Sequence, residues 1–374
     1  MNRGLIRRLG MAFVIAGVIA SGCASRPKLV SERDIPELAT ALDATHAHPN
    51  HTVLVPTLGS MGTPEVNVAI HKIESPGDRK LLVFIHGVFS DSSAWRFIIG
   101  DLVKDYDLWL VDLPGCGLSD KPSPSRMGPG GYSPAALGYR VLEALQTELA
   151  SRPGDRPIGV VAHSLGGTIT LRMFGDSALR EKFSAVTSRT DRLILLSPFD
   201  VAINKADPTF EQIAKASGLL IDVGSATGYL QDKIAEGIAN SFSDPQRALR
   251  EEAELRYRIL TNPERREATQ AMILQASSWK GKRPDWRTNL AVASMYRNVQ
   301  IPSLIIWGEQ DEILPCAMGF KLAAQMPHAD LVCVPETMHS PELEKPALVA
   351  SLIREFDATG EPPQLEPQAG IAHN

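Results

Sequence analysis

The stretch Val160-Val161-Ala162-His163-Ser164-Leu165-Gly166-Gly167 joins a strand to a helix, and this junction decides the fold of the chain. Its first half is a continuous apolar run, which is typical of a strand buried on both faces of a sheet. A serine on so tight a turn adopts a strained backbone that pushes its hydroxyl out of the sheet. Strand and helix crowd together there, so the residues two before and two after Ser164 must be small, as Ala162 and Gly166 are. The segment predicts Ser164 as a nucleophile; a serine that only caps the helix is the alternative.

Similar apolar runs recur along the chain and predict the other strands of the same sheet. Most are continuous, which favours parallel strands buried on both faces. Helical patterns separate them, and this alternation predicts an α/β fold with a mostly parallel, doubly wound sheet. The predicted strands are Val66–Ile73, Lys80–His86, Asp107–Leu113, Ile158–His163, Arg192–Ser197, Ile301–Gly308 and Ala329–Pro335. The predicted helices are Ser92–Lys104, Ser133–Ser151, Leu165–Phe174, Ala317–Met326 and Pro341–Asp357.

The alternation breaks between Ser197 and Ile301, where only helices are predicted. We interpret residues 200–296 as a helical cap inserted into a core of residues 65–199 and 297–358. The predicted cap helices are Phe210–Leu220, Tyr229–Phe242, Pro245–Leu260 and Glu264–Ser278. Apolar cap residues either line a substrate pocket or only pack the cap onto the core; they are Leu219, Leu220, Ile221, Tyr229, Leu230 and Ile234. Residues 359–374 are rich in Pro and Gln and predict a disordered tail.

The composition is that of an ordinary globular protein. The chain has 374 residues, of which 44% are apolar and 22% charged, with a formal net charge of −5. A nucleic-acid partner would need a basic face, so none is expected. Neither H-E-x-x-H nor G-x-G-x-x-G occurs, so no metal and no cofactor is expected. No acid or cysteine stands at metal-ligand spacing beside the cluster of His46, His48 and His51. We therefore expect these histidines to lie in an exposed loop.

Residues 1–22 predict a signal peptide. Three arginines precede Leu9–Ala20, an uncharged and mostly apolar run that is too short to span a bilayer comfortably. The following Ala20-Ser21-Gly22-Cys23 resembles a bacterial lipobox. That resemblance implies cleavage before Cys23 and lipid attachment to its sulfur and new amino group. A plain signal peptide with a chance cysteine, or a retained anchor helix, are the alternatives.

The lipobox resemblance implies a protein of the bacterial cell envelope that Cys23 anchors to a membrane. Ala24, in place of aspartate, favours the outer membrane, facing the periplasm. Removing residues 1–22 takes away three arginines and no acidic residue, so the net charge becomes −8 and the lipid must do the anchoring. Residues 23–64 then predict a tether and lead-in with one short helix near Pro36–Thr45. Three other cysteines remain, an odd number whose spacing predicts no disulfide: Cys116, Cys316 and Cys333.

Further motifs follow the other predicted strands. His86-Gly87-Val88-Phe89 opens a loop in which the N–H of Val88 could bind an oxyanion together with the N–H of Leu165. An acid-rich segment containing Asp311 ends a late strand, and a histidine, His339, follows the last one. Ser, Asp and His therefore all come at the carboxyl ends of strands, the edge where open α/β sheets bind ligands.

In this combination the segments resemble the α/β-hydrolase fold family, in the subgroup with an HG-x oxyanion loop, over about residues 65–357. The resemblance implies that Ser164 is the nucleophile, His339 the base and Asp311 the orienting acid. Ala162 stands where the family pattern has glycine, which is the smallest possible change. Asp200 is an alternative acid, because some relatives place it after the strand that ends here at Ser197.

A Ser-His-Asp triad with an oxyanion hole performs acyl transfer to water. We therefore expect a serine hydrolase of a carboxylic ester, with a small-molecule substrate that has an apolar acyl group, a class that includes lipid-like esters. Related dehalogenases and epoxide hydrolases carry aspartate in place of Ser164 and are excluded. The alternatives are a C–C bond hydrolase or perhydrolase on the same fold, and a non-catalytic binding protein.

Overall fold

A computed structural model of the chain describes residues 27–60, 63–151, 154–200, 208–280, 283–363 and 365. The predicted signal peptide, Cys23 and most of the predicted tail lie outside these residues. Within the described part of the chain, no helix is both long and apolar enough to cross a bilayer.

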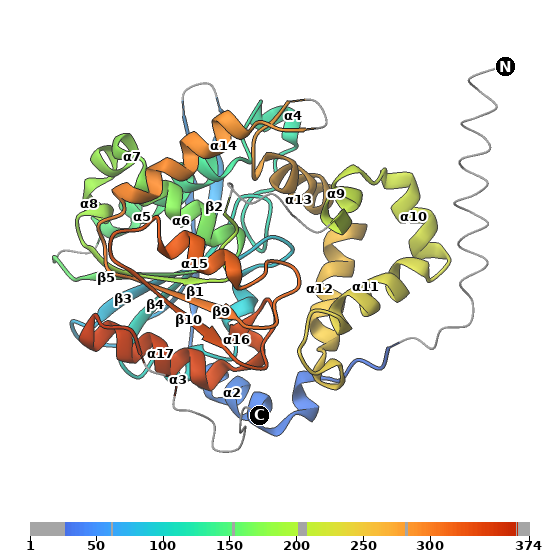
Figure 1. The fold of residues 1–374 in the computed structure, drawn as a ribbon, viewed down its shortest axis with the longest axis horizontal. Coiled ribbons are helices and arrows are strands. Elements are labelled where there is room, and N and C mark those ends of the chain that lie inside the picture. The colour runs from blue at the N-terminus through green and yellow to red at the C-terminus, as the bar shows by residue number, and fades with distance from the viewer. Residues whose placement is uncertain are drawn as a thin grey trace.

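An eight-stranded sheet forms the centre of the molecule (Figure 1). Its strand order is β1-β2-β4-β3-β5-β6-β9-β10, and β2 runs antiparallel to both of its neighbours while all other neighbours are parallel. Strands β4, β5 and β9 are buried along their whole length, as their continuous apolar runs predict. The strands are β1 (His51–Thr57), β2 (Val66–Ile73), β3 (Lys80–Ile85), β4 (Tyr106–Asp112), β5 (Ile158–His163), β6 (Thr190–Leu196), β9 (Ser303–Gly308) and β10 (Ala329–Val334).

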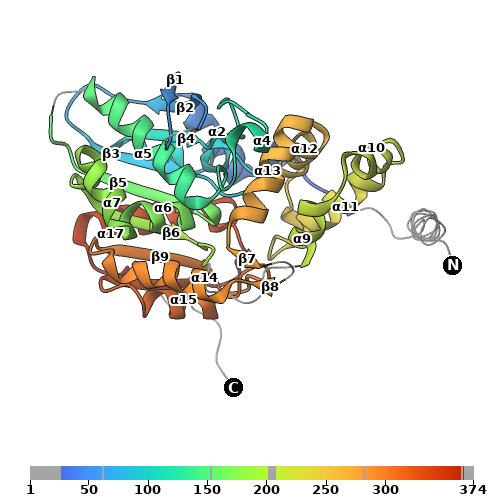
Figure 2. The same ribbon diagram turned by 90° about the horizontal axis from the view of Figure 1, so that it is seen from above.

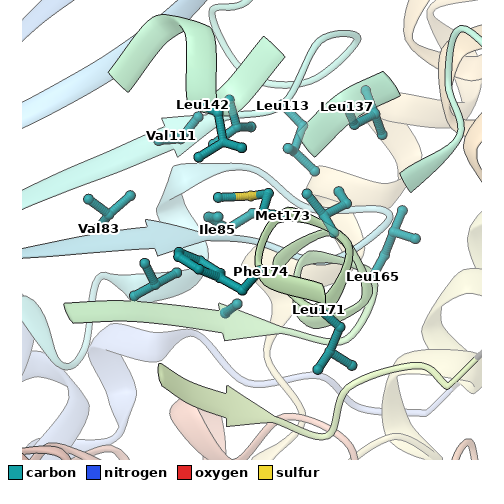
Figure 3. Packing of buried hydrophobic residues seen from close by; sticks show 14 of the residues in the cluster. Val83, Ile85, Val111, Leu113, Leu137, Leu142, Leu165, Leu171, Met173 and Phe174 are labelled. Carbon is teal, nitrogen blue, oxygen red and sulfur yellow. The ribbon is translucent and has the colours of Figure 1, made fainter. Parts of the chain in front are cut away.

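Helices cover both faces of the sheet and enclose two apolar clusters. On one face, α5 (Pro134–Ala150), α6 (Leu165–Gly175) and α15 (Ala317–Ala323) contribute to the larger cluster. Figure 3 shows part of it, where Met173 and Phe174 of α6 lie near Ile85 of β3. On the other face pack α3 (Ile99–Leu102) and α17 (Pro346–Thr359), and α2 (Pro36–His46) lies against α3. Shorter helices in the core are α4 (Pro124–Met127), α7 (Ser177–Lys182), α8 (Ser184–Thr187), α14 (Trp286–Ala293) and α16 (Pro341–Glu344).

A group of helices between β6 and β9 lies at one end of the sheet (Figure 2). These are α9 (Pro208–Lys215), α10 (Gly218–Ala226), α11 (Tyr229–Ala239), α12 (Arg250–Thr261) and α13 (Pro263–Gln275), followed by the small hairpin of β7 (Trp279–Lys280) and β8 (Arg283–Pro284). We call α9 to α13 the cap. Helix α14 lies inside the range predicted for the cap, but Ala293 at its end belongs to the large core cluster.

Several elements differ from the sequence-based expectation. Strand β1 falls within the predicted tether; it carries Pro56, and only Val55 and Thr57 are buried, so its apolar signal is weak. The three histidines expected in a loop are divided, because His46 ends α2 and His51 begins β1. The helix predicted over Ser92–Lys104 is broken into a 3-10 turn and α3, and the hairpin of β7 and β8 was not expected.

A disulfide that spacing did not predict joins Cys316 to Cys333. Cys316 precedes α15, while Cys333 belongs to the edge strand β10, so the bond fixes this edge of the sheet. Cys116 is a free, buried thiol. Stable disulfides of this kind form in oxidising compartments.

Replacing both bonded cysteines by serine should lower the stability of the protein. The bond spans 17 residues, and closing such a loop restricts the unfolded chain by about 3 kcal/mol. Calorimetry should give a lower Tm for Cys316→Ser/Cys333→Ser than for the oxidised parent. Added reductant should lower the Tm of the parent alone. Equal midpoints, together with three reactive thiols in the denatured and unreduced soluble part, would contradict the bond.

Candidate active site

Ser164 lies on a strained turn between β5 and α6. Its backbone has φ 50° and ψ −115°, a conformation that residues with a side chain rarely adopt. A Cβ on Gly166 would lie 2.2 Å from the carbonyl oxygen of Ile85, so strand and helix leave room only for glycine there. The N–H of Ser164 donates to the carbonyl of Leu196 in β6 at 2.9 Å, which fixes the turn to the sheet.

Three predicted side chains meet beside this turn. His339 Nε2 lies 3.1 Å from Ser164 Oγ, and His339 Nδ1 lies 2.7 Å from Asp311 Oδ2. The other carboxylate oxygen of Asp311 accepts the N–H groups of Ile313 and Leu314, both at 2.9 Å. All three side chains are buried. The arrangement aligns a carboxylate, an imidazole and a hydroxyl so that the imidazole can take the hydroxyl proton.

Other acidic residues of this region are placed differently from Asp311. Glu309 and Glu312 flank Asp311 but are exposed. Asp200, on the loop after β6, is buried. The carboxylate at hydrogen-bond distance from His339 Nδ1 is that of Asp311.

The backbone of the loop after β3 approaches Ser164 closely. A Cβ on Gly87 would lie 3.1 Å from Ser164 Cβ. His86 is fully buried and orients this loop, because its Nδ1 contacts the Gly87 carbonyl at 2.7 Å and its Nε2 accepts the N–H of Leu113 at 3.1 Å. Among the described residues, neither the Val88 N–H nor the Leu165 N–H donates a hydrogen bond. Two such free donors near a nucleophile can stabilise a developing oxyanion.

Backbone strain gathers at this edge of the sheet. Among the described residues, the non-glycine residues with positive φ are Phe89, Ser164, Ser197 and Glu336. Each comes after the carboxyl end of a strand, in the loop that continues from it. Strained positions of this kind persist where the surrounding structure holds them and cluster at functional sites.

The backbone around His339 is held from several sides. The carbonyl of His339 lies 2.9 Å from His163 Nε2, and the N–H of Met338 donates to Glu344 Oε1 at 2.8 Å. Gly308 leaves space for the same loop, since a Cβ there would lie 1.8 Å from the Met338 carbonyl oxygen. The position of the imidazole therefore depends on groups outside Ser164, His339 and Asp311.

Behind His163 lies a buried glutamate that sequence analysis missed, Glu342. Its Oε1 is 3.4 Å from His163 Nδ1. Its Oε2 has no hydrogen-bond partner among the described residues. Burial raises the pKa of Glu342 to about 8, and the nearby Glu252 and Glu344 act in the same direction. The only sequence signal for this residue is its place three positions after His339, in a charged Pro-Glu-Leu-Glu segment.

The protonation states of this pair follow from burial. Burial, with a smaller effect of the nearby His339, lowers the pKa of His163 to about 3. At neutral pH a neutral His163 thus faces a protonated Glu342. The carboxylic acid can donate to Nδ1, which leaves the proton of His163 on Nε2, where it donates to the carbonyl of His339. Glu342 and His163 together position the loop of His339.

A second buried glutamate nearby stays ionised. Burial of Glu252 in α12 raises its pKa, but Arg256 and Arg96 outweigh this effect and lower the pKa to about 2. Arg96 also donates to Glu32 Oε2 at 2.7 Å, and its Nη2 lies 3.0 Å from Glu252 Oε1. This network connects the chain before α2 with the cap behind the active site. Such a charge is stable when buried only because it is paired.

Within the described ranges, no group of three or more His, Cys, Asp or Glu side chains is arranged to hold a metal ion.

Comparison with known proteins identifies the family. The profile described as "Alpha/beta hydrolase family" matches residues 82–352, and the chain belongs to this family. A pimeloyl-[acyl-carrier protein] methyl ester esterase of Nitrosospira multiformis is 26% identical over 290 residues, which cover 75% of this chain and 96% of that protein. A 2-hydroxymuconate semialdehyde hydrolase of Pseudomonas is 26% identical over 288 residues, or 74% and 86% of the two chains.

Solved structures share the fold. A putative lipase of Acinetobacter baumannii superposes with a TM-score of 0.62 at 20% identity, and the match covers 90% of this chain and 99% of that one. The chain is thus an enzyme of the α/β-hydrolase type, as its motifs predicted.

Substitutions of Glu342 test its positioning role. Glu342→Leu removes the donor to His163 and should lower kcat for p-nitrophenyl butyrate by about 10- to 100-fold, with little change in KM, because a small displacement of a reacting group is costly. Glu342→Gln keeps a donor and should retain most activity at pH 7.

The pH profile separates positioning from packing. In the parent, Glu342 ionises above a pH of about 8 and can no longer donate, so kcat should fall there. The amide of Glu342→Gln does not titrate, so its kcat should fall less above pH 8. An identical alkaline decline in parent and Glu342→Gln would contradict the assignment.

Proposed function

We propose that this enzyme hydrolyses a carboxylic ester through an acyl-enzyme formed on Ser164. In this proposal His339 is the general base, Asp311 orients it, and the N–H groups of Val88 and Leu165 bind the oxyanion. The observation that carries it is the continuous alignment from the Asp311 carboxylate through His339 to Ser164 Oγ, with separations of 2.7 and 3.1 Å.

The first half of the reaction forms the acyl-enzyme. His339 Nε2 takes the proton of Ser164 as Oγ attacks the ester carbonyl carbon. Negative charge develops on the carbonyl oxygen, where one backbone donor contributes about 10²- to 10³-fold in rate. Asp311 stabilises the imidazolium that forms. The tetrahedral intermediate then collapses: the C–O bond breaks, and His339 returns the proton to the leaving alcohol.

The second half releases the acid. A water molecule gives its proton to His339 as it attacks the acyl carbon, and a second tetrahedral intermediate forms on the same donors. Its collapse breaks the bond to Oγ, and His339 returns the proton to Ser164. The products are a carboxylic acid and a free enzyme, so no cofactor is consumed.

An apolar cluster between the oxyanion loop and the cap supports an apolar acyl group. Phe89 packs there with cap residues, and Val88 lies at its edge. Three of the six cap residues considered for a pocket belong to this cluster, namely Ile221, Leu230 and Ile234. The expectation for Leu219 and Leu220 is wrong, because both are exposed. Each methylene that a substrate buries here should contribute about 0.8 kcal/mol.

A second candidate reaction is hydrolysis of a C–C bond. One relative is named for 2-hydroxymuconate semialdehyde, a compound without an ester bond. The ester reading is favoured here because another relative, of similar identity, is named as a methyl ester esterase and because the cluster beside Val88 is apolar.

Ser164→Ala tests the nucleophile. The variant should lose at least about 10⁴-fold in turnover of p-nitrophenyl butyrate, because the remaining groups have no nucleophile to activate. The parent should react with a fluorophosphonate probe and the variant should not. An unchanged melting midpoint of the variant would serve as the control for folding.

Three outcomes would overturn parts of the proposal. Ester turnover that survives in Ser164→Ala would exclude the serine mechanism. A parent that is labelled by the probe but cleaves a vinylogous 1,5-diketone much faster than any ester would favour the C–C bond reaction. Absence of labelling in the parent would favour a non-catalytic binding protein.

We further propose that lipid on Cys23 anchors the enzyme to the bacterial cell envelope. The lipobox-like sequence supports this location, and the Cys316–Cys333 disulfide suits an oxidising compartment. The enzyme would then work at the outer membrane, on its periplasmic side.

Cys23→Ser should abolish lipid attachment. Cells fed a labelled fatty acid should incorporate it into the parent chain, and the variant should carry no label, because the acceptor sulfur is absent. Ser21→Ala, which keeps Cys23, is the matched control and should remain labelled. Lipid labelling that persists in Cys23→Ser would contradict the anchor.

A further inference from the structure

The outer face of helix α10 carries an unusual concentration of exposed apolar side chains. Leu219, Leu220 and Val223 are 61%, 49% and 46% exposed. They are three of the ten large hydrophobic residues exposed in the described part of the chain, although α10 has nine residues. Their spacing places them on one side of the helix, since residues three and four apart are neighbours on its surface. Figures 1 and 2 place α10 at the end of the cap farthest from the sheet.

The same helix turns its other side toward the active site. Ile221 is buried in the apolar cluster that includes Phe89 of the oxyanion loop. The single charged residue of α10 is Asp222, whose Oδ1 lies 4.0 Å from Arg266 Nη1 in α13. The outer face of α10 is therefore apolar except for the carboxylate of Asp222. This carboxylate lies toward Arg266, which also belongs to the cap.

The amino-terminal chain reaches the fold at the cap. Val30 pairs with Leu249 at the start of α12, where its N–H donates to Ala248 and its carbonyl accepts from Arg250. Helix α12 in turn contacts α10 through a 2.6 Å hydrogen bond between Tyr257 and Ser225. Six residues lie between Cys23 and Val30, and the seven steps along this chain span at most about 25 Å. A lipid on Cys23 would therefore keep the cap close to the membrane.

We propose that α10 is a membrane-docking helix whose Leu219, Leu220 and Val223 enter the interface of a lipid bilayer. This inference rests on the proposed ester hydrolase function where it concerns the substrate. One side of α10 faces lipid, and the other faces the apolar cluster that includes Phe89. The substrate class that fits is an ester dispersed in the membrane. Such an ester would pass along the cap to reach Ser164. Amphipathic helices bind bilayers through apolar side chains of this kind.

A fluorescent probe tests the contact. With Cys23 lipidated, Cys316 bonded to Cys333 and Cys116 buried, a cysteine at position 223 gives a single reactive thiol. The full chain with Val223→Cys, labelled with a nitrobenzoxadiazole maleimide, is reconstituted in vesicles of phosphatidylcholine and phosphatidylglycerol. We expect blue-shifted emission that a spin-labelled lipid quenches. Leu58→Cys, at an exposed position just after the edge strand β1 and outside the cap, should give neither effect.

Activity measurements separate docking from chemistry. Leu219→Asp/Leu220→Asp should cut turnover of a long-chain ester in vesicles by about tenfold or more, since charge at this face opposes insertion. Its turnover of p-nitrophenyl butyrate in water should equal that of the parent. The control Leu54→Asp/Leu58→Asp places the same charges on comparably exposed leucines in and just after β1, outside the cap, and should change neither rate.

Three further outcomes remain. Two of them would contradict membrane docking by α10, and the third would contradict the proposed function instead. Equal quenching at positions 58 and 223 would overturn it. A probe at position 223 that is already blue-shifted without vesicles, in a chain that elutes as a dimer, would assign this face to a second copy instead. If no protein hydrolyses the soluble ester, the proposed function fails, while the quenching result still decides whether α10 contacts lipid.

Discussion

The turn at Ser164 is the constraint on which the rest of the structure depends. The buried strand β5 must turn into helix α6 within one residue. That residue, Ser164, makes the turn with a strained φ of 50°. The helix can then lie so close to β3 that Gly166 has no room for a side chain beside Ile85. Two consequences follow from the same geometry: the hydroxyl leaves the sheet, and the first N–H groups of α6 remain free to bind an anion. Strain at the turn is sustained by the packing on both sides of the sheet.

The parallel sheet converts distant sequence positions into one site. Asp311 follows β9 and His339 follows β10, and both strands end at the edge where β5 ends at Ser164. The imidazole of His339 is then held in position by groups that take no part in the reaction. His163 holds the carbonyl of His339, Glu344 holds the N–H of Met338, and buried Glu342 backs His163. A site of this kind is preorganised by its backbone and by hydrogen bonds to that backbone, so little reorganisation is needed when charge develops.

Sequence alone predicted the sheet and the three residues that meet at its edge, because each follows a strong apolar run and belongs to a motif. It could not predict β1, since an edge strand with Pro56 and few buried residues has a weak pattern. It could not pair Glu342 with His163, because an isolated glutamate in a charged segment usually faces water. It could not show that Leu219 faces outward, since apolar residues in a cap give no sign of which side packs. What escaped prediction depends on tertiary contacts rather than local sequence.

The cap connects the active site with the molecular surface, because the apolar cluster beside Val88 and the exposed apolar face of α10 belong to the same few helices. The central claim, however, concerns one covalent bond. The most direct measurement is mass spectrometry of the enzyme quenched with acid during turnover of p-nitrophenyl butyrate. The account predicts a butyryl group on the peptide that contains Ser164, and on no other peptide. Turnover without any acyl adduct, or an adduct on a different residue, would contradict it.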